Sequence, residues 1–156
     1  MRDCTRRIAA SRPARRAGLT VVLVGVLGGL GCSQQFIIDP GFGERYAAEK
    51  NRPMLLYFKL WDSSQHRNMI RDVFNNGAVK SELKSTVNIE LEFGFFKEYR
   101  AKYGVLRPQV CVLCTSKGEK VGTPMYVSPV PAPEKFLEWY KEQRALALEK
   151  AGDAKK

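Results

Sequence analysis

The chain contains a single Cys-x-x-Cys spacing, formed by Cys111 and Cys114. In a loop at the start of a helix, this spacing would suggest redox or metal chemistry. Here the two cysteines belong to the apolar run Pro108-Gln-Val-Cys-Val-Leu-Cys114, which predicts a buried strand. Along a strand their Cα atoms stand about 10 Å apart, beyond the ~7 Å limit for a disulfide, and the odd offset sends the side chains to opposite faces. We therefore predict two core thiols. The alternative is a bulge, or one thiol that faces Pro108.

Ser63 and His66 stand three residues apart at the predicted start of a helix. A hydroxyl beside an imidazole can act as a nucleophile with its base, but such a site also needs an orienting group and an oxyanion site. An N-cap serine followed by a polar first-turn residue explains both positions without catalysis, so we predict no catalytic residue. The free N–H groups of this helix start could instead hold an anion or a partner's carboxylate. His66 is the only histidine, which excludes a histidine-rich site, and we predict no metal and no cofactor.

The first 31 residues do not resemble the rest of the chain. They contain six arginines and one acid, and they end in an apolar run of about a dozen residues. Because this run falls short of the ~20 residues that span a bilayer, it predicts a secretory signal peptide over residues 1–31. The ending Gly31-Cys32-Ser33 resembles the lipobox of bacterial lipoproteins, with Gly29 in place of the usual aliphatic residue.

The lipobox resemblance implies cleavage before Cys32 and acylation of its thiol. The protein is then exported and membrane-anchored, and it faces the periplasm or the cell exterior. The alternatives are ordinary cleavage with Cys32 incidental, and an uncleaved membrane anchor.

Composition bounds the remaining function classes. The net charge is +10, from 26 Lys and Arg against 16 Asp and Glu, but half of the excess lies in residues 1–31. The mature chain is therefore only moderately basic, and without a supporting motif we expect no nucleic-acid binding. An apolar content of 44% is enough for the core of one domain of ordinary size.

The mature chain alternates between helical and strand patterns. A continuous apolar run after Pro53 is typical of a strand buried on both faces, and alternating apolar residues from Val87 predict a second strand. We predict strands over 54–58, 87–93, 108–114 and 120–127, and helices over 44–51, from the Asp62–Ser64 cap to Phe74, 78–83, 95–103 and from Pro133 to near Gly152. We also predict a tether over 32–43, one domain over 44–150 and a disordered tail over 151–156. This order predicts an α/β fold: a mixed central sheet with helices on both faces, finished by a β-hairpin and a C-terminal helix.

Over residues 44–150 this order resembles the thioredoxin-like superfamily. Secreted members carry Cys-x-x-Cys after the first strand, then a basic residue, a Met and a Phe, and those last three positions match Arg67, Met69 and Phe74. The two cysteine positions then fall on Ser63 and His66. The segment Tyr103-Gly-Val-Leu-Arg-Pro108 resembles the one that holds the family's cis-proline, which implies a cis bond before Pro108. A strand–Lys-Gly–strand hairpin and a closing helix complete the match.

The departure from the family pattern decides what the resemblance implies. In redox-active members the N-terminus of a helix stabilises the thiolate of the first cysteine. Neither a serine hydroxyl nor an imidazole can shuttle electrons, and residues 59–76 contain no cysteine. The resemblance therefore implies a redox-inactive thioredoxin-like protein at the cell envelope that binds or scaffolds an extended peptide or protein partner.

The implied contact surface has two parts. One part is Pro108, and the other is the loop formed by Trp61, Asp62, Ser63, Ser64, Gln65 and His66. The lipid bilayer is a second partner, through acylated Cys32. Two other functions stay open: a thiol-disulfide oxidoreductase that uses Cys111 or Cys114, and a structural envelope protein whose groove binds nothing.

Overall fold

The computed structural model describes residues 36–153. The predicted signal peptide, the lipid-attachment residue Cys32 and residues 154–156 lie outside this range. The described part contains a sheet with the strand order β2-β1-β3-β4. Its strands are β1 (Met54–Lys59), β2 (Val87–Glu92), β3 (Val110–Cys114) and β4 (Lys120–Tyr126). β1 and β2 run parallel, whereas β3 runs antiparallel to both β1 and β4, so the predicted mixed sheet is confirmed.

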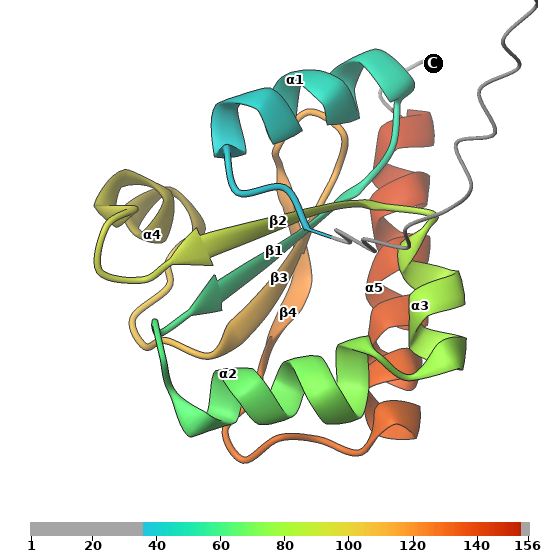
Figure 1. Cartoon of the computed structure of the whole chain (residues 1–156). Coiled ribbons are helices and arrows are strands. Elements are labelled where there is room, and N and C mark those ends of the chain that lie inside the picture. Colours follow the sequence, from blue (N-terminus) through green and yellow to red (C-terminus); the bar gives the residue numbers. More distant parts are fainter. Residues whose placement is uncertain (1–35, 154–156) are drawn as a thin grey trace, which may run out of the picture. The chain divides into compact units, whose positions relative to one another are not determined.

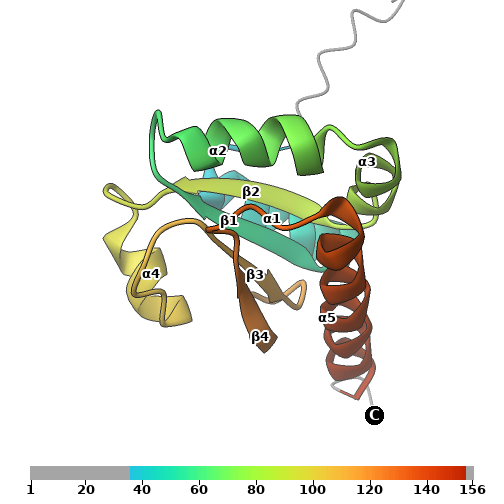
Figure 2. The ribbon, with the colours of Figure 1, turned by 90° about the horizontal axis from the view of Figure 1, so that it is seen from below.

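Helices cover both faces of this sheet. They are α1 (Pro40–Lys50), α2 (Ser64–Asn68), the π-helical turn η1 (Met69–Phe74), α3 (Gly77–Leu83), α4 (Lys97–Tyr103) and α5 (Pro133–Asp153). One hydrophobic cluster joins the sheet to η1, α3 and α5, and a second joins it to α1 and α4. Figure 1 shows α1 and α2 on opposite sides of the sheet, and Figure 2 shows α2 and α4 on opposite sides. The predicted α/β fold, with its hairpin and closing helix, is therefore confirmed.

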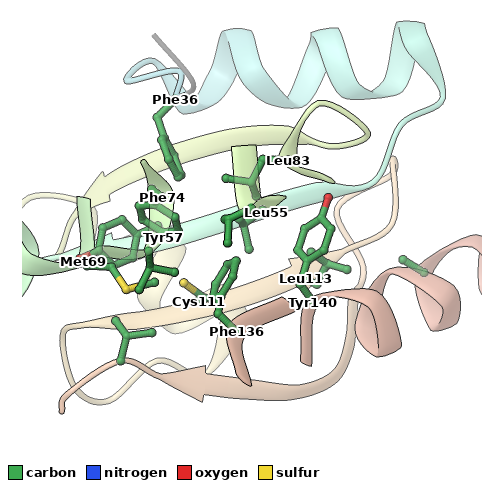
Figure 3. Packing of buried hydrophobic residues seen from close by; sticks show 14 of the residues in the cluster. Phe36, Leu55, Tyr57, Met69, Phe74, Leu83, Cys111, Leu113, Phe136 and Tyr140 are labelled. Carbon is green, nitrogen blue, oxygen red and sulfur yellow. The ribbon is translucent and has the colours of Figure 1, made fainter. Parts of the chain in front are cut away.

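β1 is the centre of the core. All six of its residues are buried, and its side chains alternate between the two hydrophobic clusters. Figure 3 shows the cluster that contains Leu55 and Tyr57. In it, the rings of Tyr57 and Phe136 pack edge-on against Phe74, at centroid distances of 5.2 and 5.6 Å. A strand covered on both faces needs apolar side chains in both directions, which explains the continuous apolar run in the sequence.

The predicted tether over 32–43 is wrong for residues 36–43, which belong to the folded domain. Phe36 is only 8% exposed, and its ring lies 4.8 Å from that of Phe74. Ile37 forms a parallel bridge with Ile89 at the outer edge of β2. Apolar contacts with the sheet thus hold a segment whose prolines and glycines suggested a linker.

α1 also begins earlier than predicted, at Pro40. Proline suits this position because the first N–H groups of a helix have no partner within the helix, and Asp39 caps the helix by accepting a hydrogen bond from the N–H of Phe42 at 3.1 Å. Gly43 is needed for packing: a Cβ there would lie 2.5 Å from Cδ1 of Ile89. The glycine therefore brings α1 closer to the sheet than any larger residue would allow.

At the other end of the domain, α5 continues to Asp153. Residues 151–153 of the predicted disordered tail are therefore helical. None of the helices in residues 36–153 is long and apolar enough to cross a membrane.

Candidate functional site

The candidate site lies at the end of the sheet where β1 and β2 finish. The last residues of these strands, Lys59 and Glu92, are partners in register. β3 starts at the same edge, because Val110 pairs with Phe58, and β4 ends there, because Tyr126 pairs with Val110. Four loops therefore meet at this edge, and they include both parts of the predicted contact surface.

Ser63 is the N-cap of α2, as its position in the sequence predicts. Its hydroxyl oxygen accepts hydrogen bonds from the backbone N–H of His66 at 3.0 Å and from Nε2 of Gln109 at 2.6 Å. No hydrogen bond joins the imidazole of His66 to this hydroxyl, so the two side chains do not form a nucleophile–base pair. Asp62, Ser64 and Gln65 are exposed around the cap.

Gln109 holds the site together, and the sequence analysis missed it. Its side chain is buried, accepts a hydrogen bond from the Tyr57 hydroxyl at 2.7 Å and donates one to Ser63. Its backbone has a left-handed φ of 59°. The backbone N–H of Gln109 donates to the carbonyl of Phe58, and its carbonyl accepts from the N–H of Val127. Gln109 thus ties α2, β1 and the segment after β4 into one network.

The implied cis bond before Pro108 is wrong. Within residues 36–153 the one cis peptide bond joins Ser128 and Pro129. Because the trans form of an X–Pro bond is favoured by about 0.5–1 kcal/mol, a proline needs specific surroundings to be cis, and the family pattern does not carry over at this position. Pro108 is half-buried at the site, and the residue that reaches the N-cap of α2 is its neighbour Gln109.

His66 points from α2 towards the sheet. Its ring stacks on Tyr57 at a centroid distance of 5.8 Å, with Nδ1 3.4 Å from the tyrosine hydroxyl. Burial is the largest effect on the imidazole and lowers its pKa, with Lys59 and Arg67 acting in the same direction against Glu90 and Glu92. The ring is therefore neutral at pH 7. Burial also raises the pKa of the Tyr57 hydroxyl, so this contact joins two uncharged groups.

Beneath the site lies a buried ion pair that the sequence analysis did not predict. Lys59 is 8% exposed and pairs with Glu90 of the neighbouring strand. The Nζ atom of Lys59 also lies 4.6 Å from the ring centre of Trp61, a cation–π contact. Glu92 lies beside Lys59 in register, and its Oε2 is buried without a hydrogen bond within the described residues. Charge is thus enclosed under the site.

Large apolar side chains surround the site and face solvent. Trp61 is 71% exposed, Phe95 83% and Leu106 85%, while Leu60 and Tyr126 are exposed to a lesser degree. They come from the loops after β1 and β2, from the loop before β3 and from the last residue of β4. The guanidinium of Arg107 lies over the ring of Tyr126, 4.9 Å from its centre. We call Leu60, Trp61, Phe95, Leu106 and Tyr126 the apolar rim.

Cys111 and Cys114 are unpaired thiols in the core, as predicted. Cys111 belongs to the cluster shown in Figure 3, and Cys114 belongs to the cluster on the opposite face of the sheet. The pairing of β3 with β4 does contain an irregularity after Cys111, but both thiols remain buried. Burial raises the pKa of Cys114 to about 12 and raises that of Cys111 as well. Neither thiol is a nucleophile near pH 7.

Comparisons with known proteins identify the fold. No protein-family model matches the chain, and neither does any curated protein sequence. Two solved structures are similar to it. The oxidised form of the Neisseria meningitidis DsbD C-terminal domain matches with a TM-score of 0.55 at 18% identity, over 70% of this chain and 99% of that one. The reduced form of the same domain matches with a TM-score of 0.57 at 19% identity, over 67% of this chain and 93% of that one. This chain has a thioredoxin-like fold.

The start of α2 contains no thiol. That helix is capped by a serine, and residues 59–76 contain no cysteine. Within residues 36–153 there is also no cluster of three His, Cys, Asp or Glu side chains that could hold a metal ion. The site consists of three parts: the hydrogen-bonded network of Tyr57, Ser63 and Gln109, which we call the floor, the ion pair of Lys59 and Glu90, and the exposed apolar rim.

Proposed function

We propose that this chain is a redox-inactive thioredoxin-like binding module of the cell envelope, which holds an extended peptide or a protein partner against its apolar rim. The observation that carries the proposal is the gathering of exposed apolar side chains at one end of the sheet, contributed by three loops and the end of β4. Single exposed apolar residues are common on protein surfaces, but a group of them marks an interaction site.

The composition of the rim suits partner binding. Trp, Tyr and Arg are the residues that most often dominate the energy of protein interfaces, and Trp61, Tyr126 and Arg107 stand at this edge. Arg107 lies over the Tyr126 ring, which favours a fixed orientation of both side chains. A partner therefore meets side chains that are already positioned.

The floor supports the rim. The bonds from Gln109 to Ser63 and Tyr57, together with the pair of Lys59 and Glu90, join β1, β2, α2 and the start of β3. Loops anchored in this way lose little conformational entropy when a partner binds. This arrangement serves recognition, and it needs no thiol.

The envelope location rests on the sequence pattern of the leader. We propose that Ser63 and His66 stand where redox-active relatives carry cysteines, and that Cys32 is acylated and anchors the protein to the bilayer. The arginine-rich start, the short apolar run and Gly31-Cys32-Ser33 support the anchor.

Site-specific photo-cross-linking in intact cells that produce the full chain tests the binding function. A photoreactive phenylalanine analogue replaces Leu106 or Phe95 in the rim, and Leu148, an exposed apolar residue of α5, serves as the matched control. We expect a discrete cross-linked product from both rim positions and none from position 148. Adding Trp61→Ala or Pro108→Ala should remove the product while the thermal unfolding midpoint stays close to that of the unsubstituted chain. Absence of a product from both rim positions, or an equal product from position 148, would refute the binding module.

Thiol labelling with an intact-mass readout separates this function from an oxidoreductase. In the folded protein we expect Cys111 and Cys114 to label only after denaturant is added, without the two-hydrogen mass loss of a disulfide. Fast labelling of either thiol in the folded protein would favour the oxidoreductase instead.

A further inference from the structure

A groove lies at the opposite end of β2 from the apolar rim. It has a volume of about 600 Å³ and runs along the outer edge of the start of β2, between α1 and α3. Figure 1 shows α3 leading into this end of the strand. The volume falls within the range of small-molecule sites in proteins, about 300–1,000 Å³. The apolar part of its lining comes from Ile37, Tyr46, Leu83 and Val87.

The charged side chains that line this groove are two lysines, Lys80 of α3 and Lys84 at the C-cap of that helix. Lys80 is half-buried and Lys84 is exposed, and they stand one helical turn apart on the same face of the helix. Neither takes part in an ion pair within residues 36–153. The acid of the same helix, Glu82, pairs instead with Lys141 and Arg144 of α5. The groove therefore has a positively charged edge, and no carboxylate in residues 36–153 forms an ion pair with its two lysines.

Two polar side chains in the wall of the groove, Thr86 and Asn88, are already hydrogen-bonded. The hydroxyl of Thr86 donates to Oδ1 of Asn88 at 2.7 Å, and Nδ2 of Asn88 donates to the carbonyl of Leu83 at 3.0 Å. Along the strand edge, Ile37 already bonds to the carbonyl of Asn88 and to the N–H of Glu90. A peptide backbone in the groove would leave most of its own polar groups without partners, which is costly. The lining suits an apolar chain with one anionic end.

We propose that this groove binds a single-chain anionic amphiphile, a fatty acid, with its alkyl chain along Leu83 and Val87 and its carboxylate at Lys80 and Lys84. The apolar contacts supply affinity, and the two lysines supply the preference for a negative head group. This site is separate from the apolar rim, and the inference does not rest on the proposed function.

Gly77 provides a direct test, because it lines the groove and a Cβ added to it would meet no atom within 4 Å. Because position 77 has room for a side chain, we expect the ring of Gly77→Phe to narrow the groove, and Gly77→Ala is its matched control. The charge is tested by Lys80→Gln combined with Lys84→Gln. Thermal unfolding of each variant verifies that it is folded.

Isothermal titration of the purified full chain with dodecanoate, below its micelle concentration, measures binding. Dodecanol and dodecylammonium are the neutral and cationic controls. We expect saturable binding of dodecanoate about tenfold tighter than that of dodecanol, as for a charge-assisted hydrogen bond. The double glutamine variant should lose this tenfold preference, Gly77→Phe should bind none of the three ligands, and Gly77→Ala should bind like the unsubstituted chain.

Three results would overturn the inference. One is the absence of saturable dodecanoate binding, and another is unchanged binding by Gly77→Phe. The third is binding to vesicles of anionic phospholipid, or to an acidic peptide, by a chain that does not bind monomeric dodecanoate. That result would make the lysines part of a membrane or protein contact.

Discussion

At the end of the sheet where β1 and β2 finish, charge is enclosed and apolar side chains face solvent. At the end where β2 starts, apolar side chains line a groove and lysines stand at its rim. The same residue type thus has opposite surroundings within one domain: Lys59 is buried against Glu90, whereas Lys84 is exposed and unpaired within the described residues. The neighbours of a lysine thus decide whether it stabilises the fold or remains available to a ligand.

Removing the buried lysine should have the largest effect. Lys59→Ala leaves the largely enclosed Glu90 carboxylate without its partner, so we expect the free energy of unfolding to fall by about 3–5 kcal/mol. Lys84→Ala, the matched control from the groove, should change it by less than about 0.5 kcal/mol. Urea unfolding of both variants measures the difference. Replacing both partners, by Lys59→Met with Glu90→Leu, should recover most of the loss. Equal effects of Lys59→Ala and Lys84→Ala would abolish the distinction between the two ends.

Removing the hydrogen bonds of Gln109 should have the next largest effect on stability. Gln109→Ala removes the partner of the Tyr57 hydroxyl and one partner of Ser63, for an expected loss of about 1–3 kcal/mol in the free energy of unfolding. Gln65→Ala, an exposed glutamine of α2, is the control and should be close to neutral. Denaturant unfolding of both variants gives the comparison. If the two losses are the same, the Gln109 network does not stabilise the site.

The neutral imidazole at the same end predicts a smaller, pH-dependent effect. Burial lowers the pKa of His66 in the folded protein below its usual value near 6.5. The unfolded chain therefore binds a proton at a higher pH than the folded chain, and the free energy of unfolding falls as the pH drops below about 6.5. Well above that pH the imidazole is neutral in both states, and His66 makes no pH-dependent contribution.

NMR titration of the full chain tests this directly, because the sequence has a single histidine. A midpoint below 6.5 is expected, and His66→Gln should remove part of the stability difference between pH 7.5 and 5.5. A midpoint at or above 6.5 would show that the ring is not desolvated in the folded protein.

Substitutions in the rim should have the smallest effect on stability. Leu106→Ser and Phe95→Ser change side chains that are 85% and 83% exposed, so we expect less than about 0.5 kcal/mol in the free energy of unfolding. Leu113→Ala, a buried residue of β3, is the contrast and should cost about 2–5 kcal/mol. Calorimetry measures all three. A rim variant that destabilises the domain as much as Leu113→Ala would mean that the rim packs against the protein itself.

Local patterns were enough to predict the sheet and the thiols. The continuous apolar run of β1 and the alternation of apolar and polar residues in β2 reflect which faces of each strand are covered by other elements. Both patterns can therefore be recognised in the sequence. The separation of Cys111 and Cys114 follows from the geometry of an extended chain and needs no knowledge of the tertiary structure. Ser63 could be predicted as the N-cap of α2 because capping depends on a few adjacent residues.

Contacts between distant segments could not be predicted in the same way. Lys59 follows five apolar residues, and only the register of β1 against β2 places Glu90 within reach of it. Gln109 depends on α2, β1 and the segment after β4 at once. Pro40 and Gly43 suggested a tether because their role in α1 requires β2 as a neighbour, and that strand lies more than 40 residues further along the chain.

The close approach of Gly43 to Ile89 has a consequence for the groove. α1 contributes Tyr46 to the groove, and the distance between α1 and β2 depends on the absence of one methyl group at position 43. The cross-section of the cavity is therefore set by a residue that does not line it. Natural or engineered exchange of this glycine offers a route to altered ligand size that leaves every contacting side chain unchanged.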